Sequence, residues 1–401
     1  MKGLPTVDAP PAEQQAESRA LAERIRSEIQ DRGGWISFER YMHLALYTPT
    51  LGYYAGRQQI FGAGGDYVTA PGLGSLFAAC VAGQVAEVLT ALEMPPAVRE
   101  EDAPREIVEF GAGGGDLAAM LLLELDRLGV LPDRYSILET GAALRARQQE
   151  RIAALPGPIA GRVRWLREMP DRVCGVILAN EVLDAMPFHR FRVQPDGRVS
   201  ALGVKAAGDG FCWDPGRALP EAANLAGALG LPPGYESEWS RQVPAWVRTA
   251  AERLEAGVLL LVDYGYDRRT YYHADRSMGT MRCHYRHLAH DDPFLWPGLQ
   301  DITAHVDFSG VWEAARAAGL TLFGYADQAR FLVGAGFADI YAGRHREAGA
   351  GSQEAMALAA EARRLTMPEE MGEQFKCIAL GRNLGGLSAF ADGDQSHRLA
   401  A

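Results

Sequence analysis

The stretch EIVEFGAGGGDL, residues 106–117, is a short apolar run followed by four closely spaced glycines. Residues 106–110 predict a strand, and the apolar spacing over 115–129 predicts a helix. Glycines between a strand and a helix let the backbone turn tightly and let a ligand lie against the main chain. The stretch therefore predicts a nucleotide-like ligand at the carboxyl end of a parallel strand, with Gly111, Gly113 and Gly115 in the binding loop.

The flanks of this loop bear on the choice of ligand. Counted from Gly111, the dinucleotide fingerprint needs its third glycine where Asp116 stands. An acid at a helix start would repel a pyrophosphate. S-adenosylmethionine (SAM) has no phosphate and is positive at its sulfonium and amino group, so Glu109 and Asp116 favour SAM. A frame from Gly113 reads G-x-G-x-x-A and leaves an NAD oxidoreductase open as the alternative.

Glu139 directly follows the next predicted strand, 135–138, and stands 24 residues beyond Gly115. That is about the spacing of a carboxylate that binds ribose hydroxyls. The position supports an adenosine ligand without separating NAD from SAM. An exposed glutamate at a strand end is the plain alternative.

The stretch NEVLDAMP, residues 180–187, follows a buried strand predicted at 173–178. Polar side chains at such a place stand at the rim of the ligand crevice, so Asn180 joins the candidate cofactor residues. Glu181 and Asp184 share one face if the segment is a helical turn, and could then bind a guanidinium. Alternatively, Asn180 caps a helix and Asp184 lies in its first turn.

Composition narrows the function classes. The chain has 401 residues, 48% of them hydrophobic and 23% charged, and a net charge of −11. Nucleic acid is a poor partner for so acidic a chain, although a cationic partner is compatible with it. No apolar run approaches the 18 residues of a membrane span, and residues 1–12 show no signal peptide. Five cysteines without a C-x-x-C pair argue against disulfides and structural zinc.

The rest of the chain predicts strands that alternate with helices, hence βαβ units and a mostly parallel sheet. We expect helices at 12–31, 38–47 (Ser37 as N-cap), 75–94 and 142–154, strands at 163–166, 258–262 and 374–381, and a hairpin of 188–193 with 198–204. The predicted division is 1–75 for N-terminal helices and a cofactor-covering loop, 76–265 for the SAM-binding core with an insertion at about 206–240, 266–370 for an inserted substrate or lid region, 371–383 for a returning strand, and 384–401 for a disordered tail.

Several motifs together resemble one family, the MidA-like SAM-dependent methyltransferases of bacteria and mitochondria. The resemblance runs from about residue 18 to about 382. It rests on SFERYM at 37–42, YTPTLGYY at 47–54, GDYVTAP at 65–71, EFGAGGGDL at 109–117, Glu139 with LRARQ at 144–148, NEVLDAMP at 180–187, DYG at 263–265, QDITAHVDF at 300–308 and MGEQFK at 371–376.

The resemblance implies a class I SAM-methyltransferase fold, a Rossmann-like α/β sheet with an N-terminal helical region and inserted substrate-covering segments. It implies SAM as the methyl donor and places Asp66 and Thr69 in the cofactor pocket, where they could otherwise be simple turn formers. A mitochondrial relative resembles a protein arginine methyltransferase that assists complex I assembly. For this chain we therefore expect a bacterial, cytoplasmic enzyme with an arginine-bearing protein substrate, no nucleic acid, no membrane insertion, and a homodimer left open.

Catalysis of that transfer needs groups that orient a guanidinium and accept its proton. Glu181 and Asp184 are the candidates for holding the guanidinium charge. Asp301, His305 and Asp307 form a second constellation, in which His305 could accept the proton. Two other interpretations of these three residues are a polar network that holds an inserted lid in place and a metal site.

One departure from the family pattern bears on the substrate. Where the family continues with an acidic residue and then Ser-Gln, residues 72–76 here read GLGSL. Methylation of a small metabolite therefore stays open, as does a SAM-binding assembly factor with little turnover.

Overall fold

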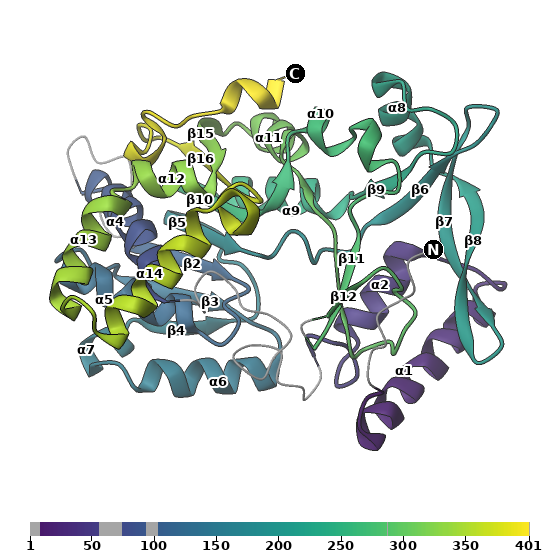
Figure 1. The fold of residues 1–401 in the computed structure, drawn as a ribbon, viewed down its shortest axis with the longest axis horizontal. Coiled ribbons are helices and arrows are strands. Elements are labelled where there is room, and N and C mark those ends of the chain that lie inside the picture. The colour runs from purple at the N-terminus through teal and green to yellow at the C-terminus, as the bar shows by residue number, and fades with distance from the viewer. Residues whose placement is uncertain (1–8, 56–73, 94–102, 287, 401) are drawn as a thin grey trace. The chain divides into compact units, whose positions relative to one another are not determined.

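The structure is a computed structural model that describes residues 9–55, 74–93, 103–286 and 288–400. Its elements are labelled in Figure 1. The chain divides into two compact units. Unit 1 takes its described residues from 1–67, 184–243 and 269–305, and unit 2 from 68–183, 244–268 and 306–401. The chain therefore leaves unit 2 twice and returns to it, and each unit is assembled from distant stretches of sequence.

Unit 2 is built on a mostly parallel sheet with the strand order β4-β3-β2-β5-β10-β16-β15. Strand β16 runs antiparallel to both of its neighbours, and β14 pairs in parallel with the end of β10. This order agrees with the class I sheet that the resemblance implies. The bounds are β2 Arg105–Phe110, β3 Arg134–Leu138, β4 Val163–Leu166, β5 Val173–Asn180, β10 Leu254–Tyr266, β14 Val306–Asp307, β15 Thr321–Asp327 and β16 Phe375–Arg382.

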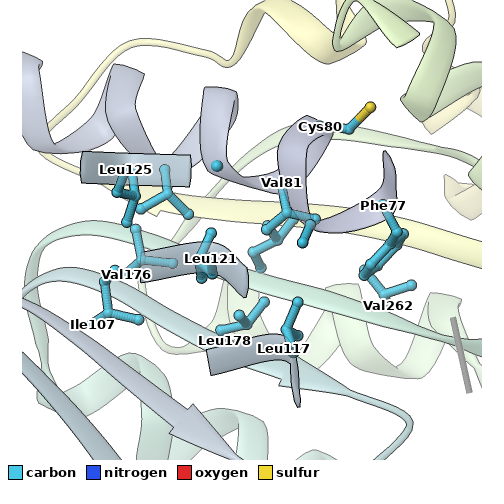
Figure 2. Packing of buried hydrophobic residues seen from close by; sticks show 14 of the residues in the cluster. Phe77, Cys80, Val81, Ile107, Leu117, Leu121, Leu125, Val176, Leu178 and Val262 are labelled. Carbon is cyan, nitrogen blue, oxygen red and sulfur yellow. The ribbon is translucent and has the colours of Figure 1, made fainter. Parts of the chain in front are cut away.

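The helices of unit 2 cover both faces of this sheet. On one face, α4 and α5 place Phe77, Val81, Leu117 and Leu121 against strand residues that include Val176 (Figure 2). On the other face, Phe110 of β2 packs edge-on against Trp246 of α9, with ring centroids 4.9 Å apart. The bounds are α4 Ser75–Ala91, α5 Asp116–Arg127, α6 Ala142–Ala153, α7 Gly157–Ala160, α9 Gln242–Arg253, α11 Phe308–Ala317, α12 Gln328–Gly334, α13 Phe337–Ala348 and α14 Gln353–Thr366. The short helix α10, Arg268–Tyr271, lies mostly in unit 1.

Unit 1 holds two smaller antiparallel sheets, β1-β7-β6-β9 with β8 beside β7, and β12-β11-β13. Apolar residues of helix α1, such as Leu21 and Ile25, form a core with Phe38 of α2 and Phe188. The bounds are α1 Ala12–Asp31, β1 Ile36–Ser37, α2 Phe38–Tyr47, β6 His189–Val193, β7 Val199–Ala207, β8 Gly210–Ala218, α8 Pro220–Leu229, β9 Glu236–Trp239, β11 Arg282–Tyr285, β12 Leu288–His290 and β13 Asp301–Thr303.

Local sequence signals account for most of these elements. Ser37 accepts a hydrogen bond from the Arg40 N–H at 3.2 Å and caps α2, as predicted. The hairpin of β6 and β7 turns through residues 194–197, where Gly197 has a φ of 80°. The predicted insertion at 206–240 contains β8, α8 and β9. Among the helices of the described ranges, none combines the length and apolar character needed to cross a bilayer.

Two expectations about the second half of the chain were wrong. Residues 306–370 do not form a separate lid with 266–305, because β14 and β15 join the main sheet and α11 to α14 pack in unit 2. The tail is not disordered. It forms short 3-10 helices at Ser388–Phe390 and Ser396–Ala400. It also buries Leu387, Ala389 and Phe390 in the core, and the burial of these three apolar side chains orders a segment whose composition is mostly polar.

Candidate active site

The glycine loop lies at the carboxyl end of β2, between the parallel strands β3 and β5. Gly111, Gly113 and Gly115 all have positive φ, of 65°, 52° and 85°. A Cβ on Gly111 would lie 2.6 Å from the Val182 side chain, and one on Gly115 would lie 3.3 Å from the Cα of Gln148. Glycine therefore suits these positions best, and the loop leaves bare main chain beside the strand ends.

Glu139 directly follows β3, at the same edge of the sheet. Its Oε1 accepts the Gly141 N–H at 2.6 Å, and its Oε2 accepts the Gln148 amide at 3.1 Å. Burial raises the pKa of this carboxyl group, and the hydrogen bonds from Gly141 and Gln148 partly offset that rise. The group is therefore held in place and half-buried in a loop region, unlike a free glutamate at a strand end.

Glu109, another candidate cofactor residue, is buried inside the sheet. It is 2% exposed within β2 and accepts the hydroxyl of Tyr135 at 2.9 Å. Burial raises the pKa of Glu109 to about 7, although the Tyr135 hydrogen bond lowers it somewhat. Its carboxyl group is thus enclosed by the sheet, whereas Asp116 lies in the first turn of α5 and pairs with Arg151 at 3.1 Å.

The segment after β5 does not form the helical turn that the sequence suggested. Glu181 has a φ of 54°, and the backbone N–H groups of Val182 and Leu183 donate to Asp263 Oδ2, at 3.1 and 2.8 Å. The element that follows β5 is the strand β6, and no helix lies between them, so Asn180 is not a helix cap. Glu181 and Asp184 do not share a helix face, and they fall in unit 2 and unit 1 respectively.

Asp263 is the residue that organises this segment, and no role was predicted for it from the sequence. It is fully buried at the end of β10, and its Oδ1 also accepts the Tyr264 N–H at 2.8 Å. An aspartate directly after the apolar run 258–262 was the signal available in the sequence.

Asn180 offers a polar atom to a ligand. Its Nδ2 donates to Glu181 Oε1 at 3.1 Å, while its Oδ1 is buried and has no hydrogen-bond partner among the described residues. A buried carbonyl oxygen without a partner costs about 1–3 kcal/mol, which a ligand donor would recover. Together with the glycine cradle and Glu139, this atom fits an adenosyl ligand.

A second group of candidates meets within unit 1. The Tyr54 hydroxyl donates to both oxygens of Asp301, at 3.0 and 2.9 Å, and its ring stacks on Tyr47 with centroids 5.5 Å apart. Burial, together with the charges of Asp301 and Asp184, raises the pKa of Tyr47. Ala304 N–H donates to the carbonyl oxygen of Asp184 at 3.1 Å, so three family motifs converge here.

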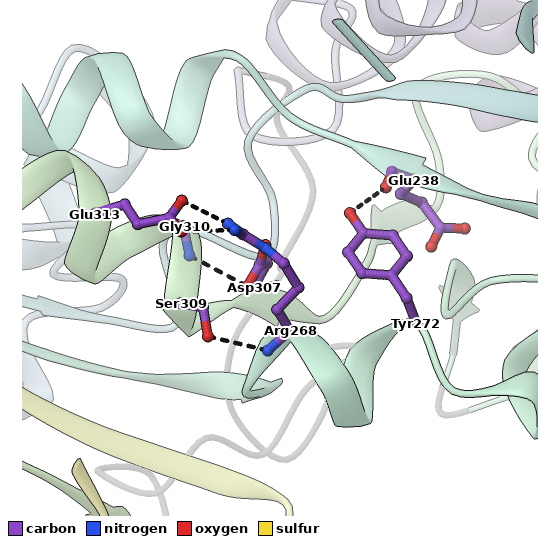
Figure 3. A network of polar contacts seen from close by, with 7 residues as sticks. All are labelled: Glu238, Arg268, Tyr272, Asp307, Ser309, Gly310 and Glu313. Carbon is purple, nitrogen blue, oxygen red and sulfur yellow. Dashed lines mark hydrogen bonds and ion pairs between the residues drawn. The ribbon is translucent and has the colours of Figure 1, made fainter. Parts of the chain in front are cut away.

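His305 is positioned through its backbone by a network around Glu238. Its N–H donates to the Thr280 Oγ1 at 3.1 Å, and that hydroxyl donates to Glu238 Oε2 at 3.2 Å. Tyr271 donates to the same carboxylate, and Tyr272 donates to the Glu238 carbonyl oxygen at 3.1 Å (Figure 3). The stretch 271–280 therefore surrounds a buried glutamate in unit 1.

Asp307 belongs to unit 2, whereas Asp301 and His305 belong to unit 1. It caps α11 through the Gly310 N–H and pairs with Arg268 at 3.0 Å, in unit 2 (Figure 3). In the described part of the chain, no group of three or more His, Cys, Asp or Glu side chains is arranged to hold a metal ion. The contacts of Asp307 are thus a helix cap and an ion pair.

Asp66 and Thr69 lie outside the described residues. So do positions 72 and 73 of the stretch 72–76, where the sequence departs from the family pattern. The start of α4, directly after that stretch, is held by a carboxylate. Leu76 N–H donates to Glu361 Oε1 at 2.7 Å, and a Cβ on Gly74 would collide with that carboxylate. A glutamate from the distant helix α14 thus occupies the start of α4, and Gly74 leaves room for it.

Comparisons with known proteins identify the family of the chain and its cofactor. Residues 80–326 match the protein family described as "Putative S-adenosyl-L-methionine-dependent methyltransferase". A COG1565 superfamily member from Burkholderia thailandensis, bound to S-adenosyl-homocysteine, is 44% identical, with a TM-score of 0.90 over 98% of this chain and 100% of that chain. A second COG1565 structure from that organism is 42% identical, with a TM-score of 0.87 over the same shares.

Named relatives are more distant. The mitochondrial protein arginine methyltransferase NDUFAF7 homolog of Drosophila melanogaster is 28% identical over 79% of this chain and 76% of its own length. The NDUFAF7 protein of Danio rerio is 26% identical over 73% and 71%. These matches confirm the resemblance to the MidA-like group and its class I fold. The chain therefore belongs to this methyltransferase family and is an enzyme that takes its methyl group from S-adenosyl-L-methionine.

Proposed function

We propose that the enzyme methylates an arginine nitrogen of a protein substrate. The observation that carries the proposal is the pair of buried carboxylates, Asp184 and Asp301, 6% and 3% exposed, beside the stacked rings of Tyr47 and Tyr54. A planar guanidinium is suited to such a place, because it forms paired hydrogen bonds to carboxylates and stacks on aromatic rings. The names of the NDUFAF7 relatives support the same substrate class.

The cofactor is assigned to residues of unit 2. Glu139 would hold the ribose hydroxyls, the bare main chain of residues 111–115 would lie against the adenosyl group, and Asn180 Oδ1 would accept a hydrogen bond from it. SAM supplies a methyl group on a sulfonium that is already a good leaving group. The chain's own task is orientation, which is worth roughly 7–11 kcal/mol in well-aligned reactions.

The nucleophile presents the harder problem. A guanidinium has a pKa of about 12.5–13.8, so outright deprotonation at neutral pH is costly. Carboxylates that hold two of its nitrogens localise the positive charge there and leave the third nitrogen nucleophilic. Asp184 and Asp301, both in unit 1, are our candidates for that role, and His305 of the same unit is the candidate proton acceptor after transfer. The positive φ of Glu181 is the kind of backbone strain that gathers at functional sites.

The test combines labelled SAM, host lysate and mass spectrometry. We expect label on arginine with the unaltered enzyme, at least a tenfold loss with Asp184→Asn and Asp301→Asn, and full activity with Asp209→Asn, an exposed aspartate of unit 1. Calorimetry with S-adenosyl-homocysteine should show unchanged binding in all three variants. Label on a metabolite pool alone would select the small-molecule alternative. Absence of any label, with cellular function kept in Glu181→Gln, would select the assembly factor.

A further inference from the structure

Gln148 is a fully buried polar residue of α6 that the cofactor assignment does not yet use. Its side-chain amide makes three hydrogen bonds. Nε2 donates to Glu139 Oε2 at 3.1 Å and to the carbonyl oxygen of Gly113 at 2.9 Å. Oε1 accepts the indole N–H of Trp165, in β4, at 3.0 Å. One amide therefore joins the glycine loop to the carboxylate that follows β3.

The orientation of this amide is forced by its neighbours. An indole N–H only donates, so the amide oxygen must face Trp165. The two N–H groups must then face the other side, where a carbonyl oxygen and a carboxylate oxygen provide two acceptors. Both N–H groups of the amide are used. A flipped amide would place N–H against the N–H of Trp165, and its oxygen against the oxygens of Gly113 and Glu139.

The consequence for Glu139 is a fixed carboxylate plane. Gly141 N–H holds Oε1 and Gln148 holds Oε2, and the Thr140 backbone adds a further hydrogen bond, so the directions of both oxygens are set. The backbone of α6 lies close to the loop as well, because a Cβ on Gly115 would be 3.3 Å from the Gln148 Cα. Trp165, Gln148, Glu139 and Gly113 thus form one hydrogen-bonded chain across β4, α6 and the two strand ends.

We propose that Gln148 is a positioning residue for the cofactor, which sets the Glu139 carboxylate and the glycine loop so that the enzyme selects the ribose hydroxyls of SAM. Trp165 acts one step further back, by fixing the amide of Gln148. The inference rests on the SAM cofactor and on the proposed contact of Glu139 with ribose. It adds that ribose selection depends on a residue that touches no part of the cofactor.

Calorimetry with two ligands tests this inference on the full chain. The probes are S-adenosyl-homocysteine and its 2′-deoxy analogue, and the measured quantity is the ratio of their dissociation constants. We expect a ratio of roughly ten or more in the unaltered enzyme, the scale of one hydrogen bond to a charged group. Gln148→Leu should lower the ratio to about one to three, and Trp165→Phe should lower it part of the way.

A matched control sits next to Gln148 on the same helix. Gln149 is exposed, so Gln149→Leu should leave the ratio unchanged. Equal weakening of both ligands in Gln148→Leu, with the ratio kept, would mean a merely structural residue and would overturn the proposal. A ratio near one in the unaltered enzyme would instead remove Glu139 from the ribose. If Gln148→Leu fails to fold, Trp165→Phe alone decides, and an unchanged ratio in that variant counts against the proposal.

Discussion

Glu109 shows at the scale of one residue how burial couples protonation to stability. Its pKa is about 7 in the folded chain and near 4.5 in an exposed setting. Between these values the folded chain keeps a proton that the unfolded chain has lost, so stability falls as pH rises from about 4.5 to 7. At 1.36 kcal/mol per unit the loss is of order 3 kcal/mol.

We therefore expect Glu109→Gln to remove most of this pH dependence, because the amide can still accept the Tyr135 hydroxyl and does not ionise. Denaturant unfolding at pH 5 and pH 8 measures the effect, with Glu150→Gln on the exposed face of α6 as the control. A variant that keeps the full slope of the unaltered protein would show that another group causes it.

Gly111 supports a prediction of steric origin. Gly111→Ala adds a Cβ 2.6 Å from the Val182 side chain at a φ of 65°. We expect a loss of about 2–4 kcal/mol in unfolding free energy, from overpacking and from roughly 1–2 kcal/mol of backbone strain. The double variant Gly111→Ala, Val182→Ala should regain the overpacking part only. Simple additivity of the two single losses would contradict a direct clash.

At the scale of a single element, the N-terminus of helix α4 is stabilised by a carboxylate from another helix. Glu361 of α14 accepts the Leu76 N–H at 2.7 Å, and backbone N–H groups of Ser75 and Phe77 also stabilise its charged form. We expect Glu361→Ala to cost about 1–2 kcal/mol, the worth of a cap with a favourable charge. Glu361→Gln keeps an acceptor and should cost less. Thermal unfolding compares them, and equal losses would argue against the charge as the cause.

Ligand binding belongs to the scale of the whole molecule. The glycine loop, Glu139 and Asn180 all lie in unit 2, so we expect S-adenosyl-homocysteine to stabilise that unit directly. At a hundred times its dissociation constant, the gain is about 2.7 kcal/mol. Hydrogen exchange resolves the two units separately, which a single melting curve does not. Protection should rise at residues 111–117 and 139–148. Protection confined to unit 1 would contradict the assigned cofactor residues.

The sequence predicted the elements whose signals are local. The strands near 106–110, 135–138, 163–166, 173–178 and 258–262 and the helices beside them were confirmed within a few residues. The strand β15, Thr321–Asp327, was missed because its short mixed run has no clear alternation. The tail was misjudged because three apolar side chains among polar neighbours do not show where they pack.

The candidate site also has a part that local sequence signals predicted and a part that only tertiary packing revealed. Glycine spacing and a carboxylate that follows the next strand by themselves predicted which edge of the sheet would bind SAM, since both signals lie within one βαβ unit. Only the tertiary structure decided that Asp263 holds the segment after β5, that Gln148 joins Glu139 to Gly113, and that Tyr54 meets Asp301. Gln148 lies 35 positions from Gly113, Asp263 lies 80 from Leu183, and Tyr54 lies 247 from Asp301, so chain packing rather than local pattern sets these contacts.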